Sequence, residues 1–536
     1  MKLSKIFTLV FCSSATLNCS STDTVIAPYE KTLDLDSSTT RSFHSMLYYP
    51  SGVLLHNPGY IIGIEKSPKV IIGGPKQKDD ENLLKNDAYV NSEMNDSNNT
   101  RNQINGFTKY DRKAMFISHI IKNDFNIIKG NLNTPYITNN YCFVYNSYIS
   151  KNLANESGID LTKINGWDAC KISSAIKDAR DAELQSFYKN SDAGLNALKD
   201  NLKYDLKKGA YSHILIIVMG WNTSQSEAVR NFNDIAGNII TASLEQTKEN
   251  AENPSAKLNT MIVQRSLVIG PRESENKNIF RPLIIGITWP SYWSTGIFNV
   301  SSYPNKANDA DELGIIWLNK IINKTIPESM SESGVKVPVI AIGHSFGARA
   351  MTRALFSSPF IKNEKMVTSP VSLAVSLQGA MSIDRFFPKL GIEGAPYRDY
   401  ARLTNTKIVL TASQFDSAVT IAKWTDPAGG YKSYEKACTQ SIYSGAFHCM
   451  TASDTSSKIE NGIFKLCNLG DTSDECADPL NSNVGPRVID YIDTSNGITE
   501  YNSLGTGGGA HSDIYRLPMG RLLWRLIQAY AIEGKQ

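Results

Sequence analysis

The chain of 536 residues lacks the features that mark several large classes of protein. No stretch reaches the roughly 18 consecutive apolar residues that a membrane-spanning helix needs. There is no dense basic block, and 55 Lys and Arg against 52 Asp and Glu leave a net charge of +3, which argues against a nucleic-acid partner. Neither C-x2-C nor H-E-x-x-H occurs, so we expect no standard zinc site, and no other cofactor is implied.

The N-terminus has the pattern of a secretory signal. A short positive region, residues 1–5, precedes a short apolar region, residues 6–11. Two routes stay open: cleavage after Ala15, or lipid attachment at Cys19 through a degraded bacterial lipobox. A buried N-terminal strand or helix is the alternative to a signal. We predict a signal peptide over residues 1–19 and export to the periplasm, cell envelope or medium, with any membrane attachment made by an N-terminal lipid alone.

Cysteine usage agrees with export, because six cysteines follow the signal and an even number suits an oxidising compartment. Six cysteines allow 15 pairings, and buried free thiols are the alternative to any of them. Pairing of neighbours along the chain would join Cys142 to Cys170, Cys438 to Cys449, and Cys467 to Cys476.

Two regions of the chain differ in their hydrophobic pattern. Residues 20–170 form a predicted accessory region, with short strands such as 60–64 and a polar linker near 76–105. In residues 171–536, solid apolar runs alternate with helical segments, which predicts a mostly parallel sheet with helices on both faces. An insertion at 424–486 carries four of the six cysteines and is expected to hold little core. The predicted strands are 214–218, 283–287, 337–342, 371–375, 407–410 and 487–489, and the predicted last helix is 519–532.

The most specific motif is Gly343-His344-Ser345-Phe346-Gly347, which fits G-x-S-x-G between a predicted strand and a predicted helix. A strand-to-helix turn this tight leaves no room for side chains two residues either side of the serine, and it exposes the serine hydroxyl at the sheet edge. The N-terminus of the helix also favours developing negative charge. We therefore predict Ser345 as a nucleophile, with a structural turn serine as the alternative.

Two further motifs carry a family resemblance. Met219-Gly220-Trp221-Asn222 follows one predicted strand, and Trp289-Pro290-Ser291 ends the next. Together with the serine motif, they resemble a bacterial family of α/β-hydrolases of unknown function, which has H-G-(aromatic)-N and W-P-S at these places. The resemblance covers roughly residues 205 to 530 and implies the α/β-hydrolase fold. Met219 replaces the family's histidine, which braces the loop, so this departure concerns the rigidity of the loop rather than its presence.

The resemblance implies roles for further residues. In this fold, two backbone N–H groups stabilise the oxyanion, and here they would belong to Trp221 and Phe346. The chain order of the catalytic triad is serine, acid, histidine. His511, in a glycine-rich loop before the last helix, is the predicted base. Asp416 is the predicted acid, and Asp384, one strand earlier, is the alternative acid.

These inferences predict a serine hydrolase, a carboxylesterase or lipase that works through an acyl-enzyme on Ser345. Its partner would be a small-molecule or lipid ester, because aromatic residues in the segment 292–308 follow the W-P-S motif. The alternative is an exported, non-catalytic binding or surface protein on a hydrolase scaffold. Met219 and the large accessory regions favour that alternative.

Overall fold

The computed structural model describes most of the chain from residue 55 onward. The predicted signal 1–19, the lipidation candidate Cys19 and the linker near 76–105 lie outside the described residues. The described residues are 55–66, 115–129, 135–146, 170, 184–208, 211–220, 223, 225–249, 280–291, 303–362, 364–416, 418, 425–454, 464–471, 479–481, 487–499 and 509–531.

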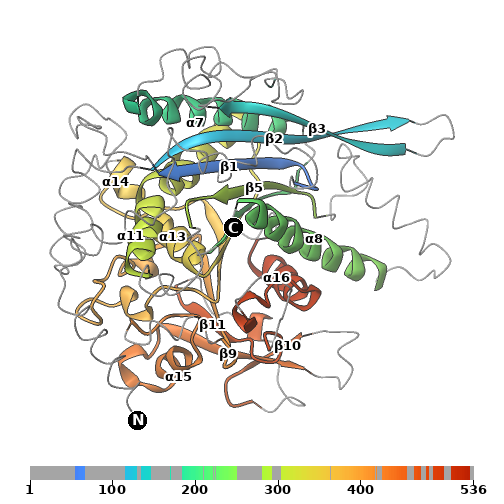
Figure 1. The fold of residues 1–536 in the computed structure, drawn as a ribbon. Coiled ribbons are helices and arrows are strands. Elements are labelled where there is room, and N and C mark those ends of the chain that lie inside the picture. The colour runs from blue at the N-terminus through green and yellow to red at the C-terminus, as the bar shows by residue number, and fades with distance from the viewer. Residues whose placement is uncertain are drawn as a thin grey trace, which may run out of the picture.

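A mixed sheet of eleven strands, in the order β10-β9-β11-β8-β7-β6-β4-β5-β1-β2-β3, runs through the described part of the chain (Figure 1). Strands from β9 to β1 in this order run parallel to their neighbours, whereas β10 at one end and β2 and β3 at the other pair antiparallel. The strands are β1 Gly59–Lys66, β2 Met115–Lys129, β3 Pro135–Asn146, β4 His213–Val218, β5 Pro282–Thr288, β6 Val339–His344, β7 Val371–Leu377, β8 Lys407–Ala412, β9 Phe447–Asp454, β10 Phe464–Asn468 and β11 Ile489–Asp493.

Five of the six strands predicted for the second region are confirmed, as β4, β5, β6, β7 and β8. The sixth, predicted at 487–489, is placed too early, because β11 spans Ile489–Asp493 and shares only Ile489 with it. Every residue of β4 to β8 is buried, which explains why these strands read as solid apolar runs rather than as an alternating pattern. The predicted strand at 60–64 is also confirmed, within β1.

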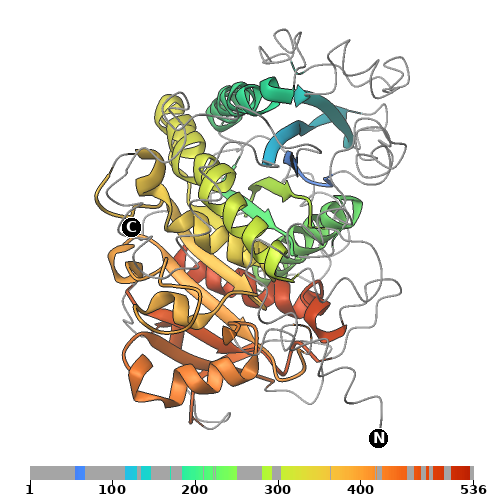
Figure 2. The same ribbon diagram turned by 60° about the vertical axis from the view of Figure 1, so that its left-hand side comes forward.

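Helices cover both faces of the sheet (Figure 2). Leu215 and Ile217 of β4 pack in one core with Phe232 of α8 and with residues of α16, whereas Ile214 and Ile216 pack in a second core with α7, α11 and α13. The chain therefore has an α/β architecture with two apolar layers. The helices are α7 Leu184–Lys207, α8 Gln225–Glu249, α11 Tyr303–Leu313, α12 Ile326–Ser333, α13 Phe346–Leu355, α14 Ser358–Lys362, α15 Tyr431–Thr439 and α16 Leu517–Tyr530, with shorter 3₁₀ or π segments at η6 Gly314–Leu318, η7 Ile321–Thr325, η8 Ile383–Phe386, η9 Tyr400–Arg402, η11 Ser441–Tyr443, η13 Pro479–Asn481 and η14 Gly509–Ser512.

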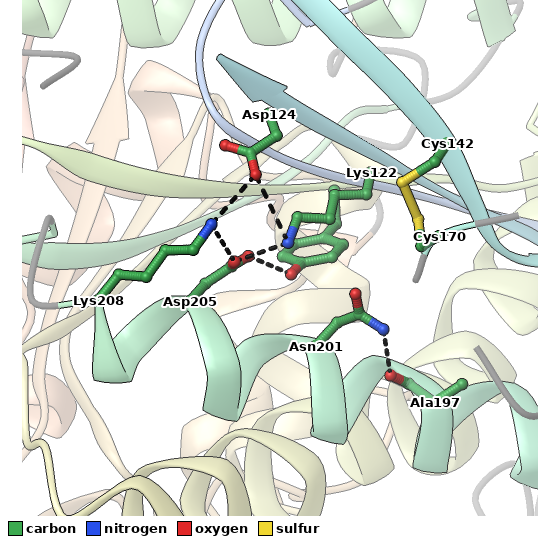
Figure 3. The surroundings of a disulfide bond; sticks show 9 residues. Lys122, Asp124, Cys142, Cys170, Ala197, Asn201, Asp205 and Lys208 are labelled. Carbon is green, nitrogen blue, oxygen red and sulfur yellow. Dashed lines mark hydrogen bonds and ion pairs between the residues drawn. A yellow bond between two sulfur atoms is a disulfide. The ribbon is translucent and has the colours of Figure 1, made fainter. Parts of the chain in front are cut away.

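The strands of the predicted accessory region belong to the same sheet as the rest. β1 pairs in parallel with β5, and the β2–β3 hairpin extends the sheet beyond β1 (Figure 1). A cluster of three buried polar residues joins β1 and β2 to α7. Asp205 of α7 accepts a hydrogen bond from the hydroxyl of Tyr60 in β1 and lies 2.6 Å from Nζ of Lys122 in β2 (Figure 3). The predicted boundary at residue 170 thus falls inside one continuous sheet.

The expectation that the insertion at 424–486 holds little core is wrong. β9 pairs in parallel with β11, and β10 pairs with β9, so part of the insertion completes one end of the sheet. Tyr434, Tyr443 and Met450 are each at most 2% exposed. The insertion gains this core because it adds strands to an existing sheet instead of folding alone.

Two of the three predicted disulfides are confirmed. Cys142 of β3 is bonded to Cys170, and Cys438 of α15 is bonded to Cys449 of β9, with Cα–Cα distances of 5.0 Å and 6.0 Å. Cys467 also forms a disulfide, whose other half lies outside the described residues. The first bond is made by the end strand β3, and the second joins α15 to β9, the strand next to the other end of the sheet.

Candidate active site

The predicted site residues gather where two neighbouring strands send the chain in opposite directions. After β4 the chain continues through α8 on one face towards β5, and after β6 it continues through α13 on the other face towards β7. Such a switch point opens a crevice at the carboxyl ends of the two strands, and ligands of open α/β sheets bind there. Met219 and Gly220 follow β4, and Ser345 follows β6.

Ser345 has an unusual backbone conformation between β6 and α13, with φ +55° and ψ −123°. A positive φ in a non-glycine residue costs of the order of 1–3 kcal/mol and persists only where the surroundings fix it. Here the end of β7 does so: Ser345 N–H donates to Leu377 O at 3.0 Å, and Ala380 N–H donates to Ser345 O at 3.1 Å.

Two glycines permit the close approaches that this turn requires. A Cβ on Gly347 would lie 2.1 Å from the carbonyl oxygen of Val218, so only glycine lets α13 begin against the end of β4. A Cβ on Gly220 would lie 2.6 Å from Ser345 Cβ and 3.2 Å from its Oγ. The backbone of the β4 loop therefore packs directly against the serine side chain.

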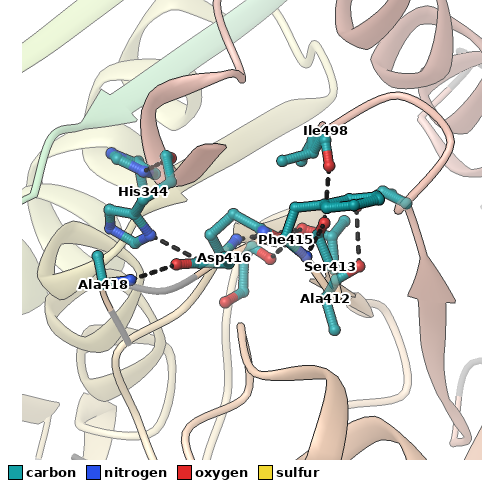
Figure 4. Close-up of polar contacts among 12 residues, drawn as sticks. His344, Ala412, Ser413, Phe415, Asp416, Ala418 and Ile498 are labelled. Carbon is teal, nitrogen blue, oxygen red and sulfur yellow. Dashed lines mark hydrogen bonds and ion pairs between the residues drawn. The ribbon is translucent and has the colours of Figure 1, made fainter. Parts of the chain in front are cut away.

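His511, in η14, is paired with Asp416, which follows β8. The His511 Nδ1–H donates to Asp416 Oδ2 at 2.8 Å. The other carboxylate oxygen of Asp416 accepts the Ala418 N–H at 3.0 Å (Figure 4). The Asp416 side chain is completely buried. With its Nδ1 proton held by the carboxylate, the imidazole presents Nε2 as the basic nitrogen.

His344, whose part in the site the sequence did not reveal, ties the His511 loop to the serine turn. Its Nε2–H donates to the backbone carbonyl of His511 at 2.9 Å, and the two ring centroids are 4.6 Å apart. Burial lowers the pKa of His344 well below its ordinary value, so this ring stays neutral. Among the described residues, no hydrogen bond joins the Ser345 hydroxyl to the His511 ring, and such contacts are often long in sites without substrate.

The structure does not bring Asp384, the alternative acid, to His511. The Asp384 carboxylate accepts the Tyr443 hydroxyl at 2.5 Å and lies 3.6 Å from Lys436 Nζ, in the region of α15. Of the two predicted oxyanion donors, Phe346 is the first residue of α13, and Trp221 lies outside the described residues.

A buried ionic cluster fixes the helix that begins at the serine. Arg349, one turn into α13, makes two hydrogen bonds to Asp311 of α11, at 3.1 Å and 2.7 Å, and a third to Glu393 at 2.8 Å. Arg385 Nη1 lies 3.0 Å from Asp311. Burial alone would raise the pKa of Asp311, but the two guanidinium groups outweigh it and hold this pKa well below its ordinary value. Sequence patterns gave no signal for this cluster beyond charged residues within apolar segments.

The W-P-S motif contacts the β4 loop from the neighbouring strand. The Trp289 indole N–H donates to Met219 O at 2.8 Å, and the Ser291 hydroxyl donates to Thr223 O at 2.9 Å. The Met219 side chain itself is buried in the apolar core that also contains residues of α8 and α16. The W-P-S motif thus holds the β4 loop through two hydrogen bonds.

Comparison with models of known protein families, with curated proteins and with solved structures found no significant match to the chain. In the part of the chain that the structure describes, no group of three or more His, Cys, Asp or Glu residues is arranged to hold a metal ion. Nor is any helix of the described ranges long and apolar enough to cross a bilayer. The assignment of an activity therefore depends on the geometry of the site.

Proposed function

We propose that the protein is a serine hydrolase of the α/β-hydrolase fold, with Ser345 as its nucleophile and carboxylic esters as substrates. One observation carries the proposal. Ser345 has a positive φ in a strand-to-helix turn at the switch point, and the neighbouring residue His344 is hydrogen-bonded to His511, which is itself paired with Asp416. Strained backbone of this kind concentrates at functional sites, where it fixes the position of a reacting group. The exposure of Ser345 that the sequence predicts is not seen, because the surrounding residues leave Ser345 only 6% exposed.

In the proposed reaction, His511 Nε2 takes the Ser345 proton while Oγ forms a bond to the ester carbonyl carbon. The tetrahedral intermediate collapses, the bond to the alkoxy group breaks, and that group leaves as an alcohol with the proton from His511. Water, deprotonated by His511, then attacks the acyl-enzyme and releases the carboxylic acid. Asp416 holds the histidine tautomer and stabilises the imidazolium.

The oxyanion would form beside the start of α13. The helix N-terminus carries partial positive charge, and the backbone of Phe346 is the predicted donor there. The predicted second donor is Trp221, next in the chain to Gly220, whose backbone packs against Ser345. This packing supports a role for the β4 loop on the oxyanion side of the site.

The substrate class remains a proposal made from the sequence. A small-molecule or lipid ester suits the aromatic residues of 292–308, of which 292–302 lie outside the described residues. Two disulfides support an oxidising compartment and hence export. Export itself is tested by mass spectrometry of the mature N-terminus, which should begin at Thr16 or at a lipidated Cys19.

A fluorophosphonate probe tests the proposed activity, because it forms a covalent bond only with an activated serine. The wild-type protein should be labelled, and the Ser345→Ala variant should not. Hydrolysis of p-nitrophenyl esters of increasing chain length should fall by at least about 10³-fold in that variant. A folded wild-type protein that neither reacts with the probe nor hydrolyses these esters would support the binding-protein alternative instead.

A further inference from the structure

We infer that Trp289 is a positioning residue for the oxyanion side of the proposed site. It acts through its indole N–H, which holds the peptide unit between Met219 and Gly220. The inference rests on the proposed function, since it names a residue on which turnover at Ser345 depends.

The first step of the argument is the position of the bond. Trp289 directly follows β5, is 4% exposed, and donates to Met219 O at 2.8 Å. The carbonyl of Met219 and the N–H of Gly220 belong to the same planar peptide unit, so fixing the orientation of one group fixes that of the other. This peptide unit belongs to the stretch of backbone that packs against the Ser345 side chain.

A second bond from the same tripeptide supports the first. Ser291 donates to Thr223 O at 2.9 Å, so residues 289 and 291 hold the β4 loop on both sides of residues 220–222. The tripeptide is itself held, because the buried Lys306 ammonium donates to Pro290 O at 2.8 Å and pairs with Asp309 at 3.1 Å. The loop is therefore braced from β5 by side chains that are themselves fixed.

Catalysis explains why such bracing matters. Donors of an oxyanion hole act because they are oriented before the charge develops, and a misplacement of about 1 Å can cost about 100-fold in rate. The Trp289 bond reaches the carbonyl of Met219, the residue before Gly220, whose backbone packs against Ser345. Loss of the indole N–H should hence lower kcat more than it raises KM.

The test compares Trp289→Phe with Trp317→Phe. Trp317 makes the same type of bond, from its buried indole N–H to Met115 O at 3.0 Å, between η6 and β2. Trp289→Phe should lower kcat for a p-nitrophenyl ester about 10- to 100-fold with KM within about threefold, whereas Trp317→Phe should keep kcat within about threefold. The pH profile of kcat/KM should keep its shape, because the His511–Asp416 bond is untouched.

If the wild-type enzyme turns over and folded Trp289→Phe retains its kcat, the inference is wrong and the proposed function stands. If the wild-type protein neither reacts with the fluorophosphonate probe nor hydrolyses esters, the proposed function fails and the inference fails with it. Should Trp289→Phe not fold, Ser291→Ala replaces it, with Ser329→Ala as the control, since Ser329 donates to Thr325 O at 2.7 Å away from the site. Equal kcat in these two variants would overturn the inference.

Discussion

Substitution of Asp416 by Asn should abolish most of the proposed activity while leaving the shape of the site intact. The carboxylate has two described donors, the His511 Nδ1–H at 2.8 Å and the Ala418 N–H at 3.0 Å, and its side chain is completely buried. An asparagine offers one acceptor and one donor in the same volume. One of these two hydrogen bonds must therefore be replaced by a contact of the wrong polarity.

The size of the expected loss in kcat depends on how the side-chain amide of the introduced asparagine is oriented. If its oxygen stays with Ala418, its NH2 group donates to His511 Nδ1, and the proton of the ring moves to Nε2, where the base is needed. The opposite orientation sets the NH2 group against the partly buried Ala418 N–H, at a cost of about 1–3 kcal/mol for unsatisfied donors. Loss of the charged acceptor for the imidazolium adds about 2–3 kcal/mol to the activation free energy. The sum predicts a fall in kcat of roughly 10³-fold.

The assay is ester hydrolysis at pH 7.5 by purified variants of matched thermal stability. Asp384→Asn is the control, because Asp384 contacts Tyr443 and Lys436 rather than the histidine. It should keep kcat within about threefold and lose about 1 kcal/mol of stability, since Tyr443 can still donate to the amide oxygen. The reasoning is refuted if Asp384→Asn matches His511→Ala in activity while Asp416→Asn remains active.

Three further predictions concern stability, measured by urea unfolding. Asp311→Ala should lower the free energy of unfolding by about 3–5 kcal/mol, because Arg349 stays buried without its two-pronged partner; a loss below about 1 kcal/mol would contradict this. Replacing both Cys438 and Cys449 by Ala should cost about 3 kcal/mol, from a sequence separation of 11, and should leave probe labelling of the serine unchanged; lost labelling in a folded variant would count against it. Burial lowers the pKa of His119 to about 3, below its value of about 6.5 in the unfolded chain. As pH falls below about 6.5, the unfolded chain binds a proton that the folded protein does not, so the free energy of unfolding decreases. Between pH 7.5 and 5.0 the wild type should lose about 2 kcal/mol more than His119→Gln, and equal losses would refute the assignment.

The sequence predicts the central strands and the serine turn well because both depend on local patterns. A strand buried on both faces must be apolar throughout, and a strand-to-helix turn with a serine at its apex needs glycine on each side. Such local contexts predict Ser345 and His511, and the choice between Asp416 and Asp384 depends on which strand precedes each. The structure brings Asp416 to the histidine. Its catalytic role is still a prediction.

Other features depend on contacts between distant segments, which no local pattern encodes. The partners of Arg349 lie on α11 and in a loop after β7, and the Trp289 bond crosses from one strand end to another. The sequence contains the W-P-S motif but does not reveal which group accepts the hydrogen bond of its indole N–H. Likewise, the β1 residues looked like part of an accessory region because their partner, β5, comes much later in the chain.

The position of β1 in the sheet also constrains the order in which the chain can fold. β1 ends at Lys66, whereas its parallel neighbour β5 begins only at Pro282, and β5 must itself pair with β4. A chain that emerges N-terminus first can therefore form the antiparallel β2–β3 hairpin early, but β1 has an unpaired edge until the middle of the chain arrives. Pairing across such a long separation is slow, because a large loop must close first. β1, the earliest strand in the part of the chain that the structure describes, thus needs long protection from pairing with other chains.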